Sequence, residues 1–84
     1  GDITVIYDNE PRNKEIVKQI EKTINQGRSI VLWPDTLKEK DINDMILSGY
    51  TKSQIQKIIE DNTFEGVAAK LRFTGWKKIN ERSV

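Results

Sequence analysis

Cysteine and histidine are both absent from this 84-residue chain. Without cysteine the chain cannot form a disulfide scaffold, a thiolate zinc site or a cysteine nucleophile. Without histidine it lacks the commonest general base and the commonest nitrogen ligand for metals. Any metal site must therefore be built from oxygen ligands, which favour hard cations such as Mg²⁺.

An excess of one charge and a long hydrophobic run are also missing. Fourteen Lys and Arg residues stand against 13 Asp and Glu residues, for a formal net charge of +1, which excludes a polybasic arm or an acidic tail. No apolar stretch approaches the roughly 20 residues of a membrane helix, and no basic segment precedes the first apolar run as in a secretory signal. We therefore expect a cytoplasmic protein with no membrane partner.

The first half of the chain holds two short apolar runs separated by a helical pattern. Residues 3–7 (ITVIY) and 29–33 (SIVLW) are typical of strands that are covered on both faces, as in parallel sheets. Residues 11–26 predict a helix that starts at Pro11, with Asn9 or Glu10 near its cap. One stripe of this helix is apolar and consists of Ile16, Val17, Ile20 and Ile24. Strand, helix and strand over about 30 residues indicate a βαβ unit with parallel strands.

The second half predicts three short helices, which begin at Asp41, Thr51 and Thr63. Gly49 ends the first of them, and Gly75 breaks the pattern after the third. The residues expected to face inward are Ile42, Met45 and Ile46 in the first helix, Ile55, Ile58 and Ile59 in the second, and Phe64, Val67, Ala68 and Leu71 in the third. In the strands we expect Ile3, Val5, Ile30 and Leu32 to be buried.

Together these patterns predict one α/β domain over residues 1–84, a βαβ unit with parallel strands followed by short helices. Two parallel strands make a poor sheet by themselves. We therefore expect the chain to be part of a larger domain, cut from a longer chain, with further strands supplied by upstream sequence.

Two acidic residues, Asp8 and Glu10, follow the first strand. Ligands collect at the carboxyl ends of strands in open α/β sheets, and side chains spaced by two on an extended backbone project to the same side. The pair could therefore hold a divalent cation. Alternatively, the two acids only favour the positive end of the helix dipole.

A second polar segment, Lys40-Asp41-Ile42-Asn43-Asp44, follows the second strand and is expected at the same edge of the sheet. Asp41 and Asp44 are three residues apart and could both face that edge from one helical turn. Alternatively, Asp41 is a plain helix cap and Asp44 a surface residue. Like charges held close repel by about 1–4 kcal/mol per pair, and a bound cation would offset that repulsion.

These segments carry a family resemblance. The segments YDNEPRNKEIV, IVLWPD, KDINDMILSG and AAKLRFTGWKKI resemble the Toprim domain, a metal-binding fold of DNA primases, topoisomerases and some nucleases. Over residues 3–79 they are most similar to the C-terminal part of this domain in primases of T-even-like bacteriophages. Glu10 stands where that family has the second aspartate of a DxD motif. The family also uses a glutamate from a preceding strand, and no residue of this chain can supply it.

The resemblance implies an incomplete Toprim-like fold and Mg²⁺- or Mn²⁺-dependent nucleotidyl transfer that makes RNA primers on single-stranded DNA. It implies metal binding by Asp8, Glu10, Asp41 and Asp44, with Asp8 and Glu10 also catalytic, and contact of Lys40 with the triphosphate. The implied partners are the single-stranded template, nucleoside triphosphates and a replicative helicase, in the cytoplasm of the phage host. The isolated 84-residue chain is expected to be inactive.

Other interpretations stay open. The chain could be a non-catalytic replication or transcription accessory domain that keeps a degenerate Toprim half for docking, or a piece of a Toprim nuclease or topoisomerase. Arg12 and Lys14 could contact triphosphate or template phosphates, or they form only a solvated basic surface. The last quarter of the chain is the most basic part and could be a weak nucleic-acid surface, with Lys70, Arg72, Lys77, Lys78 and Arg82. Trp33 and Trp76 are expected to pack in the core, although Trp76 could instead stack on single-stranded template.

Overall fold

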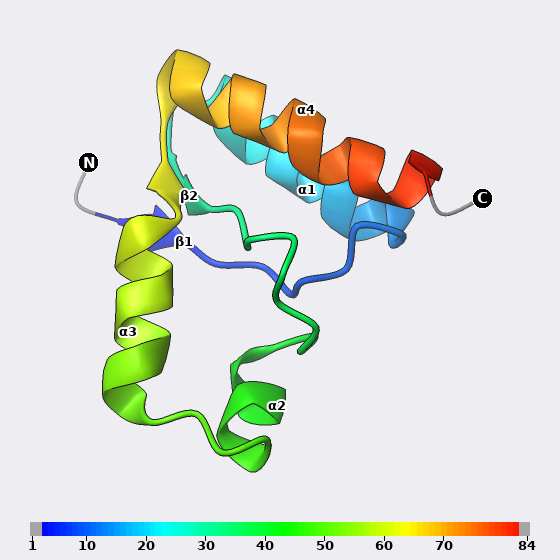
Figure 1. The fold of residues 1–84 in the computed structure, drawn as a ribbon. Coiled ribbons are helices and arrows are strands. Elements are labelled where there is room, and N and C mark those ends of the chain that lie inside the picture. The colour runs from blue at the N-terminus through cyan, green and yellow to red at the C-terminus, as the bar shows by residue number, and fades with distance from the viewer. Residues whose placement is uncertain (1–2, 83–84) are drawn as a thin grey trace.

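A small sheet lies between two pairs of helices in the computed structural model, which describes residues 3–82 of the chain (Figure 1). Along the chain the elements are β1 (Thr4–Val5), α1 (Lys14–Asn25), β2 (Ser29–Val31), α2 (Ile42–Leu47), α3 (Lys52–Asp61), β3 (Thr63–Phe64) and α4 (Gly66–Arg82). The order confirms a mixed α/β chain that begins with a βαβ unit.

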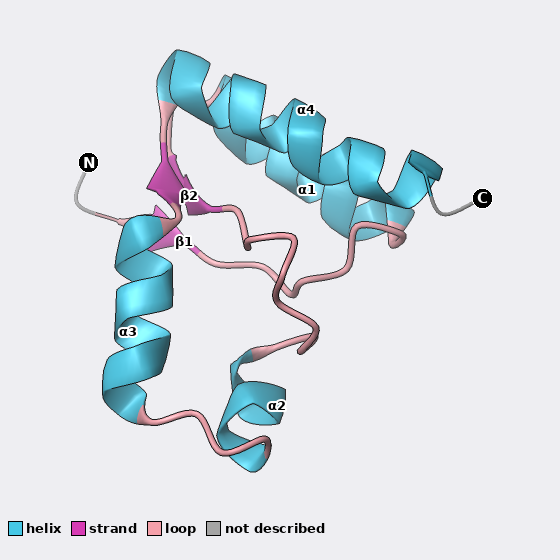
Figure 2. Cartoon of the chain, in the orientation of Figure 1, coloured by secondary structure: helices cyan, strands magenta, loops and turns pink. Residues whose placement is uncertain are grey.

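The sheet has the strand order β1-β2-β3 in the described residues (Figure 2). β1 pairs in parallel with β2, as predicted, and Val5 lies opposite Ile30. β3 was not predicted: Thr63, expected to begin a helix, instead lies opposite Val31 in an antiparallel pairing. The physical reason is that the second edge of β2 would otherwise leave backbone groups unpaired.

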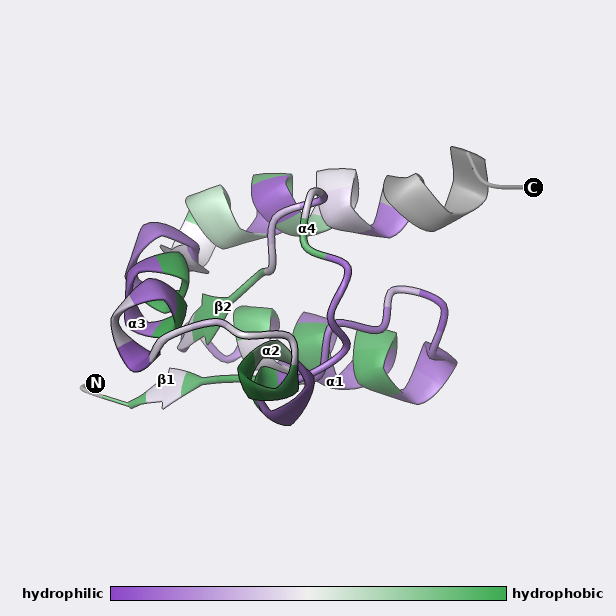
Figure 3. Cartoon of the chain, turned by 60° about the horizontal axis from the view of Figure 1, so that its bottom comes forward, coloured by the Kyte–Doolittle hydropathy of each residue, from purple (hydrophilic) through white to green (hydrophobic). Residues whose placement is uncertain are grey.

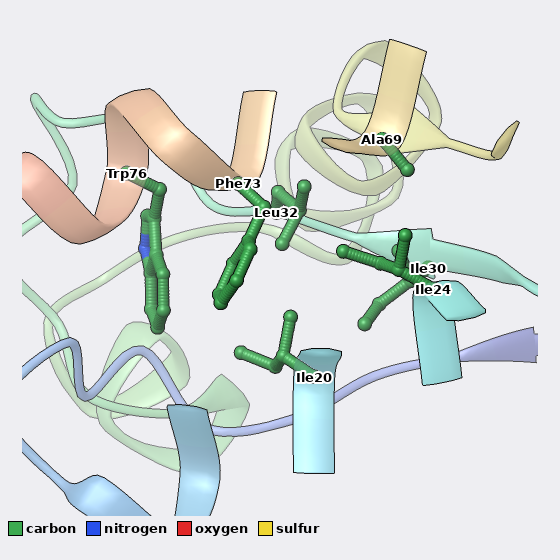
Figure 4. Close-up of a cluster of buried hydrophobic side chains, with 7 residues drawn as sticks. All are labelled: Ile20, Ile24, Ile30, Leu32, Ala69, Phe73 and Trp76. Carbon is green, nitrogen blue, oxygen red and sulfur yellow. The ribbon is translucent and has the colours of Figure 1, made fainter. Parts of the chain in front are cut away.

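Strand β2 and the two extended residues that follow it separate two hydrophobic clusters, because successive side chains of an extended chain point to opposite faces. Ile30 and Leu32 face α1 and α4, and Val31 and Trp33 face α2 and α3. The first cluster consists of Ile20, Ile24, Ile30, Leu32, Ala69, Phe73 and Trp76 (Figure 4). The second consists of Val31, Trp33, Leu37, Met45 and Ile55. This confirms the prediction that the second apolar run is covered on both faces.

The start of helix α1 lies later than predicted. Asn13, rather than Asn9 or Glu10, is the cap residue, and its Oδ1 accepts hydrogen bonds from the backbone N–H groups of Glu15 and Ile16. The predicted apolar stripe is confirmed in the core or packed against it. Helices α2 and α3 begin after the cap residues Asp41 and Thr51, as predicted, and each cap side chain accepts a hydrogen bond from a backbone N–H of the first turn.

Helix α4 differs most from the prediction, because it begins at Gly66 and continues through Gly75. Val67, Ala68 and Leu71, which were expected inside, are exposed. Because β3 occupies the predicted start of the helix, the inward stripe is shifted, and it consists of Ala69, Phe73 and Trp76. Although α4 is 17 residues long, no helix within residues 3–82 is long and apolar enough to cross a membrane.

Two further burial predictions are wrong. Ile3 is 71% exposed and Ile46 is 57% exposed. β1 lies at the edge of the sheet, so it is not enclosed as β2 is, and Val5 is only half-buried. Figure 3 shows both hydrophobic and hydrophilic residues in α2, and a helix of six residues cannot bury all of its hydrophobic side chains against one neighbour.

Candidate functional site

The loops that follow β1 and β2 are bound to each other through Asn9. Its backbone N–H donates to the carbonyl oxygen of Lys40 at 2.6 Å. Its side-chain Nδ2 donates to the carbonyl oxygens of Leu37 and Glu39 at 3.0 and 3.1 Å. The two segments singled out in the sequence therefore lie together at one end of the sheet.

This arrangement brings a carboxylate and an ammonium group close to each other. The Nζ of Lys40 lies 3.9 Å from Oε1 of Glu10, and the two side chains are 58% and 29% exposed, respectively. The Nδ2 of Asn13 donates to the other carboxylate oxygen of Glu10 at 3.4 Å. An ion pair this exposed contributes about 1 kcal/mol or less, so a ligand can compete for either group.

The backbone on which Asp8 sits is well anchored. The preceding residue, Tyr7, accepts a hydrogen bond from Trp33 Nε1 on its carbonyl oxygen at 2.8 Å. The Tyr7 hydroxyl lies 3.0 Å from Oγ1 of Thr23 in α1. The Asp8 carbonyl accepts a hydrogen bond from the N–H of Glu10 at 2.9 Å. Contacts from the segment after β2 and from α1 thus anchor the loop after β1 that carries the half-buried Asp8.

Asp41 has the geometry of a helix cap. Its Oδ1 accepts a hydrogen bond from the N–H of Asp44 at 2.8 Å, and its carbonyl accepts one from Met45 at 3.1 Å. Asp44 lies in the first turn of α2, where the helix dipole favours a negative charge. Both residues therefore have a structural role, which does not prevent the second carboxylate oxygen of Asp41 from binding a cation.

The acids offer a limited donor set for a metal ion. In the part of the chain that the structure describes, no three acidic side chains come together in a group that could hold a metal. Mg²⁺ commonly uses only one or two protein carboxylates, with water and substrate phosphates as its other ligands. Asp8 and Glu10 fit that donor set. Metal binding by Asp8, Glu10, Asp41 and Asp44, and phosphate binding by Lys40, stay predictions.

One polar pair beside this site was missed in the sequence. The hydroxyl of Tyr50 donates to Oε1 of Glu39 at 3.1 Å and so joins the loop after β2 to the loop after α2. The pKa of Glu39 lies below its ordinary value, mainly because the backbone N–H of Glu39 hydrogen-bonds to the carboxylate. The hydrogen bond from Tyr50 adds to this lowering. The same contact with Glu39, helped by burial, raises the pKa of Tyr50. Residues 11 apart in loops carry no local pattern that would have revealed the pair.

The basic and aromatic candidates divide between surface and core. Arg12, Lys14 and Lys70 are exposed. Arg72 lies over the ring of Phe64 and Lys77 over that of Phe73, with 5.8 and 5.2 Å to the ring centroids. The side chains of Lys78 and Arg82 are not among those that the structure describes.

The two tryptophans lie in the core. Trp33 and Trp76 are buried, and the ring of Trp76 stacks on that of Phe73 with 6.2 Å between the centroids. This confirms the predicted packing role of both residues.

Comparisons with known proteins give one informative similarity. No protein-family model matches the chain. Over 76 residues the chain is 36% identical to the DNA primase of Enterobacteria phage T4. The matched region covers 88% of this chain and 22% of that primase, so the chain spans about a fifth of the length of the relative. The chain is therefore related in sequence to a part of a bacteriophage DNA primase.

Proposed function

We propose that this chain forms part of the nucleotidyl-transfer site of a Toprim-type phage DNA primase, which makes RNA primers on single-stranded DNA. The observation that carries the proposal is the junction of the loops after β1 and β2, which places the Glu10 carboxylate 3.9 Å from the Lys40 ammonium. A chain related to a primase thus presents an acidic and a basic group together at the carboxyl ends of its parallel strands, where α/β sheets bind ligands.

The proposal gives each charged group a role. Asp8 and Glu10 would hold Mg²⁺ or Mn²⁺, with Asp41 and Asp44 as more distant ligands. When bound, the metal stabilises negative charge on the transferring phosphoryl group and the leaving pyrophosphate. Lys40 would bind a triphosphate oxygen as a point charge, exchanging its exposed contact with Glu10 for a phosphate contact.

The proposed site is completed by the rest of a primase. A further carboxylate on a preceding strand would add to the pair in this chain, and the regions that bind template and nucleotide would also lie elsewhere in the protein. A replicative helicase is a proposed partner of the whole primase. The 84-residue chain alone should therefore bind the metal weakly and make no primers.

A Mn²⁺ titration of the isotopically labelled chain, followed by NMR, tests the metal proposal. Paramagnetic broadening should first affect the amides of Asn9, Glu10 and Asp41, and excess Mg²⁺ should reverse it. The amides of Glu60 and Asp61, at the exposed acidic end of α3, serve as the control. Broadening of equal strength at both places would contradict the proposal and leave the non-catalytic docking interpretation.

A further inference from the structure

Asn9 lies between the two proposed metal ligands, Asp8 and Glu10, and its hydrogen bonds reach more distant segments of the chain than theirs do. Besides its bonds to the loop after β2, its Oδ1 lies 3.4 Å from the indole Nε1 of Trp76 in α4. The residue thus joins three segments, the loop after β1, the loop after β2 and the last helix.

These partners require an amide side chain. The carbonyl oxygens of Leu37 and Glu39 can only accept hydrogen bonds, so both need a donor, and the amide nitrogen of Asn9 supplies both N–H groups. The indole N–H of Trp76 can only donate, so it needs the acceptor at Oδ1. Aspartate would place an oxygen against two carbonyl oxygens, and glutamine is one methylene longer.

We infer that Asn9 is a positioning residue for the proposed metal site, a role that rests on the proposed function. Its side-chain amide sets the separation of the two loops and therefore the placement of Glu10 relative to Lys40. Mg²⁺ demands near-ideal octahedral geometry, and groups that orient metal ligands strongly affect metal affinity. A residue that makes no contact with the metal itself would thus control its binding.

Two substitutions that add the same charge separate positioning from simple electrostatics. Asn9→Asp adds a carboxylate between two acids but removes the donors to Leu37 and Glu39. Asn43→Asp adds a carboxylate at an exposed position in the first turn of α2, where a negative charge is favoured, and it leaves the hydrogen bonds of Asn9 and Glu10 in place. Mn²⁺ affinity of the 84-residue chain is measured for both variants and the parent by electron paramagnetic resonance, at a temperature where circular dichroism shows all three folded.

The positioning role predicts that Asn9→Asp weakens Mn²⁺ binding by about 10-fold or more, while Asn43→Asp binds as tightly as the parent or more tightly. If added charge alone mattered, both substitutions would strengthen binding. Equal or tighter binding by Asn9→Asp therefore overturns the inference. If Asn9→Asp does not fold, Asn9→Ser, which is neutral and can donate only one hydrogen bond, replaces it and should weaken binding in the same direction.

Amide hydrogen exchange separates failure of this inference from failure of the proposed function. If the parent chain binds no Mn²⁺, the metal proposal fails for this chain. In that case Asn9→Asp should still accelerate exchange at residues 8–10 and 39–41 relative to Asn43→Asp. Equal exchange in the two variants would show that Asn9 does not hold the loops together.

Discussion

Asn9 and Asp41 are both short polar residues that follow a strand, and their different roles depend on how far away their partners lie. Asp41 bonds to the backbone three residues further along, a local cap pattern that the sequence reveals. Asn9 bonds to residues 28, 30 and 67 positions away. Such partners come together only in the fold, so the sequence suggested nothing more for Asn9 than a place near a helix cap.

The contrast between buried and exposed leucines gives a stability prediction. Leu32 is 1% exposed in the first cluster, whereas Leu71 is 72% exposed on α4. Leu32→Ala should lower the free energy of unfolding by about 2–4 kcal/mol through lost burial and a cavity. Leu71→Ala should change it by less than about 0.5 kcal/mol. Urea denaturation measures both, and similar costs for the two variants would contradict the described packing of α4.

The Glu39–Tyr50 hydrogen bond predicts a pH dependence. The pKa of Glu39 is lowered from its ordinary value of 4.5, so its contribution to stability is present above that pH and is lost as the pH falls through the folded-state pKa. The pKa of Tyr50 is raised from 10.0, so its contribution is full below pH 10.0 and is lost as the pH rises through the higher folded-state pKa.

The titration of Tyr50 gives the direct measurement. An NMR titration of the Tyr50 ring should give a pKa above 10.0 in the parent. Glu39→Ala removes the acceptor and its charge and should move that pKa back down. An unchanged Tyr50 pKa in the variant would show that the two side chains do not interact in solution.

At the scale of elements, the sequence predicted α1 well and α4 poorly. The apolar stripe of α1 repeats at helical spacing within one uninterrupted segment, so its inward face followed directly. The inward face of α4 depends on where the helix begins, and that is set by the pairing of Thr63 with Val31, 32 positions earlier. The pattern of single residues does not contain that pairing.

Two glycines test the described course of α4. Gly75 lies inside the helix, and a Cβ added there meets nothing within 4 Å. Gly75→Ala should therefore raise the free energy of unfolding by about 0.5–1 kcal/mol. Gly66 has a φ of +62°, and Gly66→Ala should lower stability by about 1–2 kcal/mol. Thermal unfolding followed by circular dichroism measures both, and a destabilising Gly75→Ala would indicate a break in the helix at that position.

At the scale of the whole molecule, a general rule predicted the meeting of the two polar segments. The carboxyl ends of neighbouring parallel strands lie at the same edge of a sheet, and Glu10 and Lys40 do lie together there. The rule does not supply a complete set of acidic ligands, and among residues 3–82 no three acids come together in a group that could hold a metal. Since the chain spans 22% of the related primase, further ligands of the proposed site would lie in other parts of such a protein.

Primer synthesis by a full-length primase that contains this chain tests the central claim most directly. Asp8→Ala or Glu10→Ala should reduce it by about 1,000-fold or more, because a lost metal ligand removes several kcal/mol of charge stabilisation. Folding should persist, because Asp8 and Glu10 are only half-buried and the exposed ion pair of Glu10 with Lys40 contributes about 1 kcal/mol or less. Asp61→Ala, which removes an exposed acid paired with Lys57, should leave priming intact. Normal priming by Asp8→Ala and Glu10→Ala would contradict the account and favour a non-catalytic docking role.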